Sequence, residues 1–452
     1  MDFTPSEEQA AAQGLAARIF GDLSTHDRLV AAGSGTDAGL WKELCAAGLP
    51  GAVEETGLLG LVLLAEEQGR TTAQVPFVAS CVYGLLAVAE HGTDEQCGRL
   101  LAPFRDGTAV AAGAFPACGT VQAETRGGLS AAVVPEAGGG RSTAVVPEAG
   151  GGRGVTVAPG AGGALGAVTH PEARGDRSAV TDPEARGDRS AVTDAEARGD
   201  RSAVTHPEAR GGQGVATGPQ ADGGVSATVH VEPGGWLNGS VPLVPWLRDA
   251  THVLVAAEDR TLWIVRTADP GVVTEPVETT APWSAGRLVL AGAPAERLGG
   301  PEAYEEVLAT ARTAFAGVQA GVCAGSLARA VEHTGTREQF GRPLSTNQAV
   351  LLRAADAYMD TEAIRVTAYE AAWRHDEGLP YGEQALNAAW WASEAGRRVV
   401  HAGQHLHGGT GADLDHPVHR HFLWGRQLDA HLGGSGTVLQ ELGELLVKEG
   451  PK

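Results

Sequence analysis

Two short segments in the last third of the chain carry residue types that suit phosphate chemistry. One reads R-E-Q-F-G from Arg337 to Gly341, and the other reads H-L-H-G-G-T-G from His405 to Gly411. A guanidinium offers a planar fork of N–H donors to phosphate oxygens, and adjacent glycines let backbone amides approach an anion closely. The two segments therefore predict a site for a phosphate-bearing ligand.

Each of these features also has a purely structural explanation. An arginine before a turn is often simply solvated, and a Gly-Gly pair can end a helix. The same region holds five histidines: His405, His407, His416, His419 and His421. Dense imidazoles can bind zinc, but no cysteine and no well-spaced set of carboxylates completes a site here. We therefore expect surface and interface histidines and no metal.

Length, composition and charge limit the class of protein. The 452 residues suffice for two or three domains, and 43% apolar and 20% charged residues are typical of a soluble globular protein. The net charge of −21 argues against nucleic acid or an anionic membrane as the main partner. Five scattered cysteines, an acidic N-terminus without a signal core and the lack of a long apolar run predict a cytoplasmic protein without disulfides.

Helical patterns fill the first quarter of the chain. Ser6 is placed to cap a helix whose first turn holds Glu7 and Glu8. Further helices are expected over residues 39–47, 58–68, 75–90 and 94–101. We therefore predict an all-α domain over residues 1–112.

A 12-residue repeat occupies the middle of the chain, from 124 to 220. Its best copies read A-R-G-D-R-S-A-V-T-D-P-E and run in tandem from Ala173 to Glu208. A fixed period can indicate a β-solenoid, but each copy offers little apolar surface beyond one Ala-Val pair. Gly, Pro and charge dominate, so burial cannot offset the entropy of ordering the chain. We predict a disordered surface insertion.

Alternating β patterns flank the repeats. Strands are expected over 226–231, 251–256, 262–266, 272–277 and 287–291, and the segment 109–115 belongs with them. We predict a small middle β-sheet or barrel domain over 113–298, in which the repeats replace a hairpin loop.

Long helical patterns fill residues 299–452. Pro301 opens a helix that reaches His333, and Ser345 is placed to cap a second that ends near Gly378. Further helices are expected over 382–405, from 417 to 433 and over 437–447. Small residues in the first helix allow close neighbours, which predicts an antiparallel bundle. The expected fold class is α+β multidomain, with an N-terminal α-helical domain, a middle β domain and a C-terminal bundle.

This order of domains, with the two segments in place, resembles the acyl-CoA dehydrogenase family. In that family the arginine of the R-x-x-F-G segment contacts the FAD pyrophosphate. The next contact comes from a turn and the start of the following helix, where a Gln stands. A Q-x-x-G-G loop of the partner subunit contacts the adenine and the pyrophosphate. Here a histidine stands at the Gln position of that loop. The resemblance implies FAD as the cofactor, bound by Arg337, Gln339, Phe340, Asn347, Gln348, His405, Gly408 and Gly409.

The resemblance also implies a carboxylate that takes the α-proton of the substrate. Most members carry it in a Y-E-G-T turn, where this chain has Leu432, or Gly433 after a shift of one residue. Some members carry the base on the first bundle helix instead, and that position corresponds to Val318 here, next to Gln319. None of these side chains ionises, so no catalytic residue is assigned. Two nearby residues could accept the proton only if their helix directed their side chains toward the substrate: Asp429 and His431.

The β domain departs from the family pattern as well. The family's T-E-P-G-x-G-S-D strand end is replaced by Ala114–Thr120, and its W-x-L-N-G-x-K segment becomes Trp236–Val241 without the Lys. These departures resemble the base-lacking subunits of heterotetrameric, steroid-type bacterial acyl-CoA dehydrogenases, as does the stretch from His405 to Leu432.

The resemblance implies a FAD-dependent acyl-CoA dehydrogenase that introduces an α,β double bond into an acyl-CoA thioester. It further implies an electron-transfer acceptor and a homologous subunit that bears the base, in a hetero- or homo-oligomer arranged as a dimer of dimers. Two alternatives stay open: a non-catalytic structural subunit of such a complex, and a flavin-dependent oxidase acting on a thioester.

Overall fold

The computed structural model describes residues 3–115 and 228–449. The repeats at 124–220, and the insertion predicted there, lie outside the described residues, as does most of the segment from Ala114 to Thr120. The account below concerns the compact unit that contains both described ranges.

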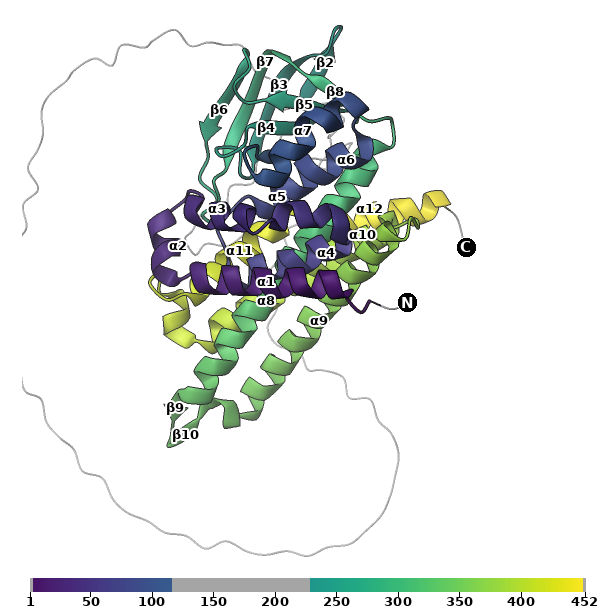
Figure 1. The fold of residues 1–452 in the computed structure, drawn as a ribbon. Helices are drawn as coiled ribbons and strands as arrows, with labels where there is room; N and C mark the ends of the chain where they lie inside the picture. Colours follow the sequence, from purple (N-terminus) through teal and green to yellow (C-terminus); the bar gives the residue numbers. More distant parts are fainter. Residues whose placement is uncertain (1–2, 116–227, 450–452) are drawn as a thin grey trace, which may run out of the picture. The chain divides into compact units, whose positions relative to one another are not determined.

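The N-terminal part is helical, as its periodicity predicts (Figure 1). A capping box starts its first helix, because the Ser6 hydroxyl accepts from the Gln9 amide at 3.2 Å while the Gln9 side chain accepts from the Ser6 amide at 2.9 Å. The fourth helix begins earlier than predicted and continues through a kink at Gly57, where φ is +71°. The elements are α1 (Glu7–Leu23), α2 (His26–Ala32), α3 (Ala38–Ala46), α4 (Leu49–Thr71), α5 (Phe77–Ser80), the π-helical turn η1 (Cys81–Leu86), α6 (Ala87–His91) and α7 (Asp94–Asp106).

The middle part contains two four-stranded sheets, with strand orders β1-β4-β5-β8 and β2-β3-β7-β6. β1 pairs in parallel with β4, which confirms that the segment before the repeats belongs to a sheet; the other pairs are antiparallel. β3 was not predicted, because Asn238, Gly239 and Pro242 interrupt its alternation and bulges shift its register. The strands are β1 (Ala111–Ala114), β2 (Val229–Glu232), β3 (Trp236–Val244), β4 (His252–Ala256), β5 (Leu262–Arg266), β6 (Val272–Pro276), β7 (Gly286–Pro294) and β8 (Glu296–Leu298).

The C-terminal part is a helical bundle in which α8 and α9 run side by side, joined at their far end by the hairpin β9–β10 (Figure 1). The prediction that Ser345 caps the second helix was wrong. Ser345 lies in a 3-10 turn closed by the Asn347 amide on the Leu344 carbonyl, and Asn347 is the cap. The elements are α8 (Ala303–Thr336), β9 (Glu338–Gln339), β10 (Arg342–Pro343), the turn η2 (Leu344–Thr346), α9 (Gln348–Asp376), α10 (Gly382–Leu406), the turn η3 (Gly408–Ala412), α11 (Val418–His431) and α12 (Ser435–Glu449).

Close contact between α4 and α8 explains the small residues of α8. A Cβ on Gly321 would lie 2.0 Å from the Glu66 carbonyl oxygen, and one on Gly69 would lie 2.0 Å from the Val318 carbonyl oxygen. The sequence predicts no apolar run long enough to span a membrane, but α8 is long and apolar enough to do so. However, 72% of its apolar stretch is buried inside the protein. It is therefore placed as a core helix of the bundle.

Candidate functional site

The predicted phosphate-binding segments meet at one end of the bundle. Arg337 ends α8, and Gly408 and Gly409 follow the end of α10. The rings of His333, in the last turn of α8, and His407, next to Gly408, stack with centroids 4.6 Å apart. One chain thus presents both segments in the same region, and the expectation that each FAD takes its glycine loop from the partner subunit stays a prediction.

The hairpin after Arg337 is shaped to present side chains outward. Phe340 is fully exposed and has φ of +54°, and Gly341 follows with φ of +73°. A positive φ is uncommon for a bulky residue and marks a constrained position worth a functional explanation. The Arg337 side chain is exposed and forms no ion pair with any residue of the described ranges. The guanidinium and the phenyl ring are therefore both available to a ligand.

The glycine turn after α10 is anchored to that helix by a hydrogen bond, and Gly408 and Gly409 are exposed to solvent. The His407 ring donates from Nδ1 to the Gly403 carbonyl at 2.7 Å, which fixes the turn against α10. A Cβ added to Gly408 or Gly409 would have no atom within 4 Å, so their backbone is accessible. Exposed glycine amides and an uncommitted guanidinium fit the phosphates of FAD.

The other residues that the resemblance assigned to FAD lie close to these two segments along the chain. Gln339 is in β9, and His405 is exposed at the end of α10. Asn347 stands at the N-cap position of α9 without a side-chain capping hydrogen bond, and Gln348 is the first residue of α9. Arg342 Nη2 donates to the Asn347 side-chain oxygen at 3.2 Å, which ties the hairpin to α9. Their contact with FAD stays a prediction.

A row of imidazoles supports this end of the bundle. His416 lies against His407, with ring centroids 5.0 Å apart, and His333 lies on the other side of His407. Burial, followed by the neighbouring cationic groups, lowers the pKa of His333 and of His416. Within residues 3–115 and 228–449, no three His, Cys, Asp or Glu side chains are arranged to hold a metal ion.

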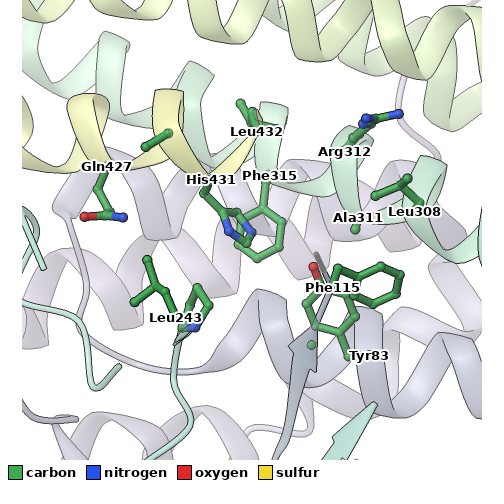
Figure 2. Close-up of a pocket in the computed structure, with 13 residues that line it drawn as sticks. Tyr83, Phe115, Leu243, Leu308, Ala311, Arg312, Phe315, Gln427, His431 and Leu432 are labelled. Atoms are coloured by element: carbon green, nitrogen blue, oxygen red, sulfur yellow. The ribbon is translucent and has the colours of Figure 1, made fainter. Parts of the chain in front are cut away.

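A separate cavity of about 110 Å³ lies where α8 and α11 face the β domain (Figure 2). Its wall includes Leu432, one of the two positions at which the family pattern implies the carboxylate. Thirteen residues line the cavity, and none of them is Asp or Glu. The cavity therefore contains no carboxylate from the described residues that could take a substrate proton.

The other positions considered for a base have different surroundings. Val318 and Gln319 are buried and do not line the cavity; Gln319 donates to the Gly425 carbonyl at 3.4 Å. Asp429 accepts from the Ser393 hydroxyl and pairs with Arg426 at 3.2 Å. Neither Asp429 nor these α8 residues is therefore placed to act in the cavity.

His431, in contrast, does face the cavity, beside Phe315 (Figure 2). Its ring packs edge-on against Phe315 with centroids 4.4 Å apart. Burial lowers the pKa of His431 to about 4, so the imidazole is neutral near pH 7. A neutral imidazole in this position can donate one hydrogen bond and accept another.

Sequence reasoning missed most of the cavity wall. Tyr83 comes from η1, Phe115 follows β1, and Arg312 comes from α8, where it pairs with Glu441 of α12 at 2.5 Å. The position of the Tyr83 ring requires glycine at 113, because a Cβ on Gly113 would lie 2.4 Å from that ring. A glycine within a β run was the one local signal for this close approach.

Comparison with known proteins agrees with this geometry. The model of the acyl-CoA dehydrogenase C-terminal domain matches residues 299–442. The acyl-CoA dehydrogenase FadE27 of Mycobacterium tuberculosis is 40% identical over 201 residues, which cover 41% of this chain and 53% of FadE27. FadE28 of the same organism is 33% identical over 27% of this chain and 36% of its own length. The chain thus spans about half, or less, of the length of these curated relatives.

Solved structures match over almost the whole chain. A variant of the steroid ACAD Tcur3481-Tcur3483 is 34% identical, with a TM-score of 0.71 and 98% of each chain covered. The ChsE4-ChsE5 complex from Mycobacterium tuberculosis is 25% identical, with a TM-score of 0.71 and 100% of each chain covered. The chain belongs to the acyl-CoA dehydrogenase family, whose members are FAD-dependent flavoproteins.

Proposed function

We propose that this chain is a subunit of a FAD-dependent acyl-CoA dehydrogenase and that a homologous partner supplies the proton-accepting carboxylate. The observation that supports this most directly is Leu432 in the cavity wall, at the position where a base is expected. The α-proton of a thioester is weakly acidic, so its removal requires a positioned base. We do not assign the base to His431, because burial lowers its pKa and so disfavours the imidazolium that proton removal would create.

In this proposal the exposed end of the bundle holds the cofactor. In a site shared between subunits, Arg337 binds the pyrophosphate, the amides of Gly408 and Gly409 bind further phosphate oxygens, and Phe340 shields the ring system over the neighbouring subunit's cavity. Gln339, Asn347, Gln348 and His405 provide polar contacts around them. When bound, FAD supplies the acceptor for the hydride that leaves the substrate β-carbon. The chain's own residues bind and orient the dinucleotide.

An exposed apolar face on α9 supports a partner subunit. Its large side chains are more than half exposed, at 55–63% of their surface: Leu351, Leu352, Tyr358 and Met359. Contiguous exposed apolar side chains on one helix are typical of an interaction surface. The face adjoins the hairpin that carries Phe340, so a partner covering it would also reach the proposed cofactor site.

The names of the structural relatives favour a heteromer with a bulky substrate. Tcur3481-Tcur3483 is described as a steroid ACAD, and ChsE4-ChsE5 is described as a complex. We extend both properties to this chain as part of the proposal: a second, base-bearing homologue and a bulky CoA thioester.

The visible spectrum of the purified protein tests the proposal. We expect the full chain to be colourless alone and to gain flavin absorbance when it is co-expressed with a base-bearing homologue, and the complex to bleach on addition of acyl-CoA. A yellow chain that bleaches without a partner would contradict the need for a second subunit. A complex that assembles without flavin would favour the structural alternative.

The assembly itself is tested by a charge on the α9 face. Met359→Glu should prevent complex formation and flavin uptake, because it buries a carboxylate in the interface. Val30→Glu is a matched control, since Val30 is also exposed but lies on α2. Equal assembly of the two variants would show that the partner does not dock on α9.

A further inference from the structure

His431 is a polar group in a largely apolar cavity wall. Its ring orientation is set by Phe315, with centroids 4.4 Å apart, and by Trp283, with centroids 6.1 Å apart. The ring of His431 is half-buried, and no hydrogen bond of the described residues involves either of its nitrogens. A neutral imidazole carries one N–H donor and one acceptor, so it can hydrogen-bond a ligand that enters the cavity. The cavity therefore favours a ligand that hydrogen-bonds His431.

The electrostatics of the cavity select a neutral ligand. Arg312 is the arginine of the wall, and its positive charge is already balanced by Glu441 at 2.5 Å. Burial keeps His431 uncharged near neutral pH. An ionised ligand group would add an uncompensated charge to a poorly solvated site, whereas a hydroxyl would not. A hydroxyl can also pair with either ring nitrogen, because it both donates and accepts.

The volume of the cavity limits the ligand to a few atoms. About 110 Å³ exceeds the space that one water needs and is less than the cavity of about 150 Å³ that binds benzene. Clefts for drug-sized ligands measure about 300–1,000 Å³. A chain of a few carbons with one oxygen fills this space, so any bulkier part of the acyl group must lie outside the cavity.

We propose that this cavity binds the short end of a hydroxylated acyl thioester and that His431 determines this specificity by hydrogen bonding the hydroxyl group. The proposal rests on the proposed function for the thioester class of the ligand. Its test measures thioester binding by the isolated chain, because His431 and Phe315 in the cavity wall belong to this chain.

Two thioesters that differ by one oxygen test the proposal. We suggest titrating the full chain, without partner, with 3-hydroxybutyryl-CoA and with butyryl-CoA, followed by calorimetry and by the tryptophan fluorescence, to which Trp283 beside His431 contributes. The hydroxylated thioester should bind about tenfold more tightly, as one buried hydrogen bond allows. His431→Phe should abolish this preference, so that the two thioesters bind with equal affinity. Equal affinities in the wild type, a preference that persists in His431→Phe, or no binding of either thioester would overturn the proposal.

Two further variants make the result specific. His431→Gln keeps a donor and an acceptor and should retain part of the preference, which separates lost hydrogen bonding from misfolding. His230→Phe is the matched control, because His230 is half exposed on β2 and pairs with Glu258 away from the cavity. Flavin uptake by the co-expressed complex distinguishes the two proposals. If the complex lacks flavin but the isolated chain still prefers the hydroxylated thioester, only the proposed function is contradicted. If the complex contains flavin but the isolated chain shows no such preference, only this inference is contradicted.

Discussion

His333 and His407 stack with their ring centroids 4.6 Å apart and thereby join the end of α8 to the glycine turn after α10. His416 extends the row on the far side of His407. Since the backbone amide of Arg337 bonds the His333 carbonyl at 2.8 Å, the stack supports both proposed FAD-binding segments. The protonation of His333 and of His416 should therefore affect this end of the bundle.

Acid should destabilise the protein through this stack. The pKa of His333 and of His416 lies below the ordinary value of 6.5, so the unfolded chain binds more protons as the pH falls. The stabilisation is fully present above pH 6.5 and is lost as the pH falls toward the folded pKa values. Thermal melts between pH 8 and pH 5 should show this slope, and His333→Phe should make it shallower. Equal slopes in His333→Phe and in the control His230→Phe would contradict the prediction.

Asp376 should stabilise the kink of α4. Its two carboxylate oxygens accept from the amides of Leu58 and Leu59 at 2.8 and 2.9 Å, directly after Gly57. The carboxylate thus caps the second half of α4 from the end of α9. Asp376→Ala should lower the free energy of unfolding by about 1–2 kcal/mol, as measured in urea. Asp356→Ala, at an exposed position of the same helix, should change it little.

His375 should give the opposite pH dependence. Burial alone would lower its pKa, but hydrogen bonds with Asp376 at 3.0 Å and Glu90 at 3.2 Å outweigh burial and raise the pKa to about 9. A raised pKa means that this stabilisation is present below pH 6.5 and is lost as the pH rises through 9. The free energy of unfolding should fall by the order of 1–3 kcal/mol over this range. His375→Gln should remove that fall; an unchanged alkaline slope would show that the ring is not charged in the folded protein.

Elements with strong local patterns were predictable from sequence. The strand over 262–266 was confirmed residue for residue as β5, and α10 extends the predicted helix by a single residue to Leu406. β3 was missed, because Pro242 and the bulges remove the period-2 signal and the strand is held by its pairing with β7. Tertiary pairing there outweighs local preference.

The turn at Leu432 and the cavity differ in how far the sequence could predict them. Leu432 could be placed because the turn motif around it is local. The cavity could not, because Tyr83, Phe115, Phe315 and His431 come from four distant elements and meet only in the folded chain. The orientation of His431 in particular depends on how α11 packs against α8. Such a juxtaposition leaves no periodic signal in the sequence.

Gly113→Ala should partly close the cavity. The added methyl would lie 2.4 Å from the ring of Tyr83, so the ring must move toward the cavity that it lines. Overpacking of this kind costs about 1–3 kcal/mol. Thermal denaturation should show the loss, and the affinity for 3-hydroxybutyryl-CoA should fall with it. Gly98→Ala is the control, because it lies within α7 with nothing near the added methyl and should not destabilise the protein. Equal stability of the two variants would mean that Tyr83 moves freely.

Arg337 should matter for flavin retention and not for folding. Its side chain is exposed and pairs with no carboxylate in the described part of the chain, so Arg337→Ala should leave the melting temperature of the isolated chain unchanged. In the co-expressed complex, the same change should lower the flavin content at least about tenfold, because a charge-assisted contact to phosphate is lost. Arg337→Lys keeps the charge but loses the planar fork, so it should retain an intermediate amount.

Arg353→Lys provides the matched control for this series. Arg353 is exposed in α9, on the helix that follows the hairpin, and is outside the residues assigned to FAD. Its replacement should leave the ratio of flavin to protein at the wild-type value. If Arg337→Ala also kept that ratio, the guanidinium would be no more than a solvated side chain before a turn, and the phosphate contacts would have to come from the glycine turn alone.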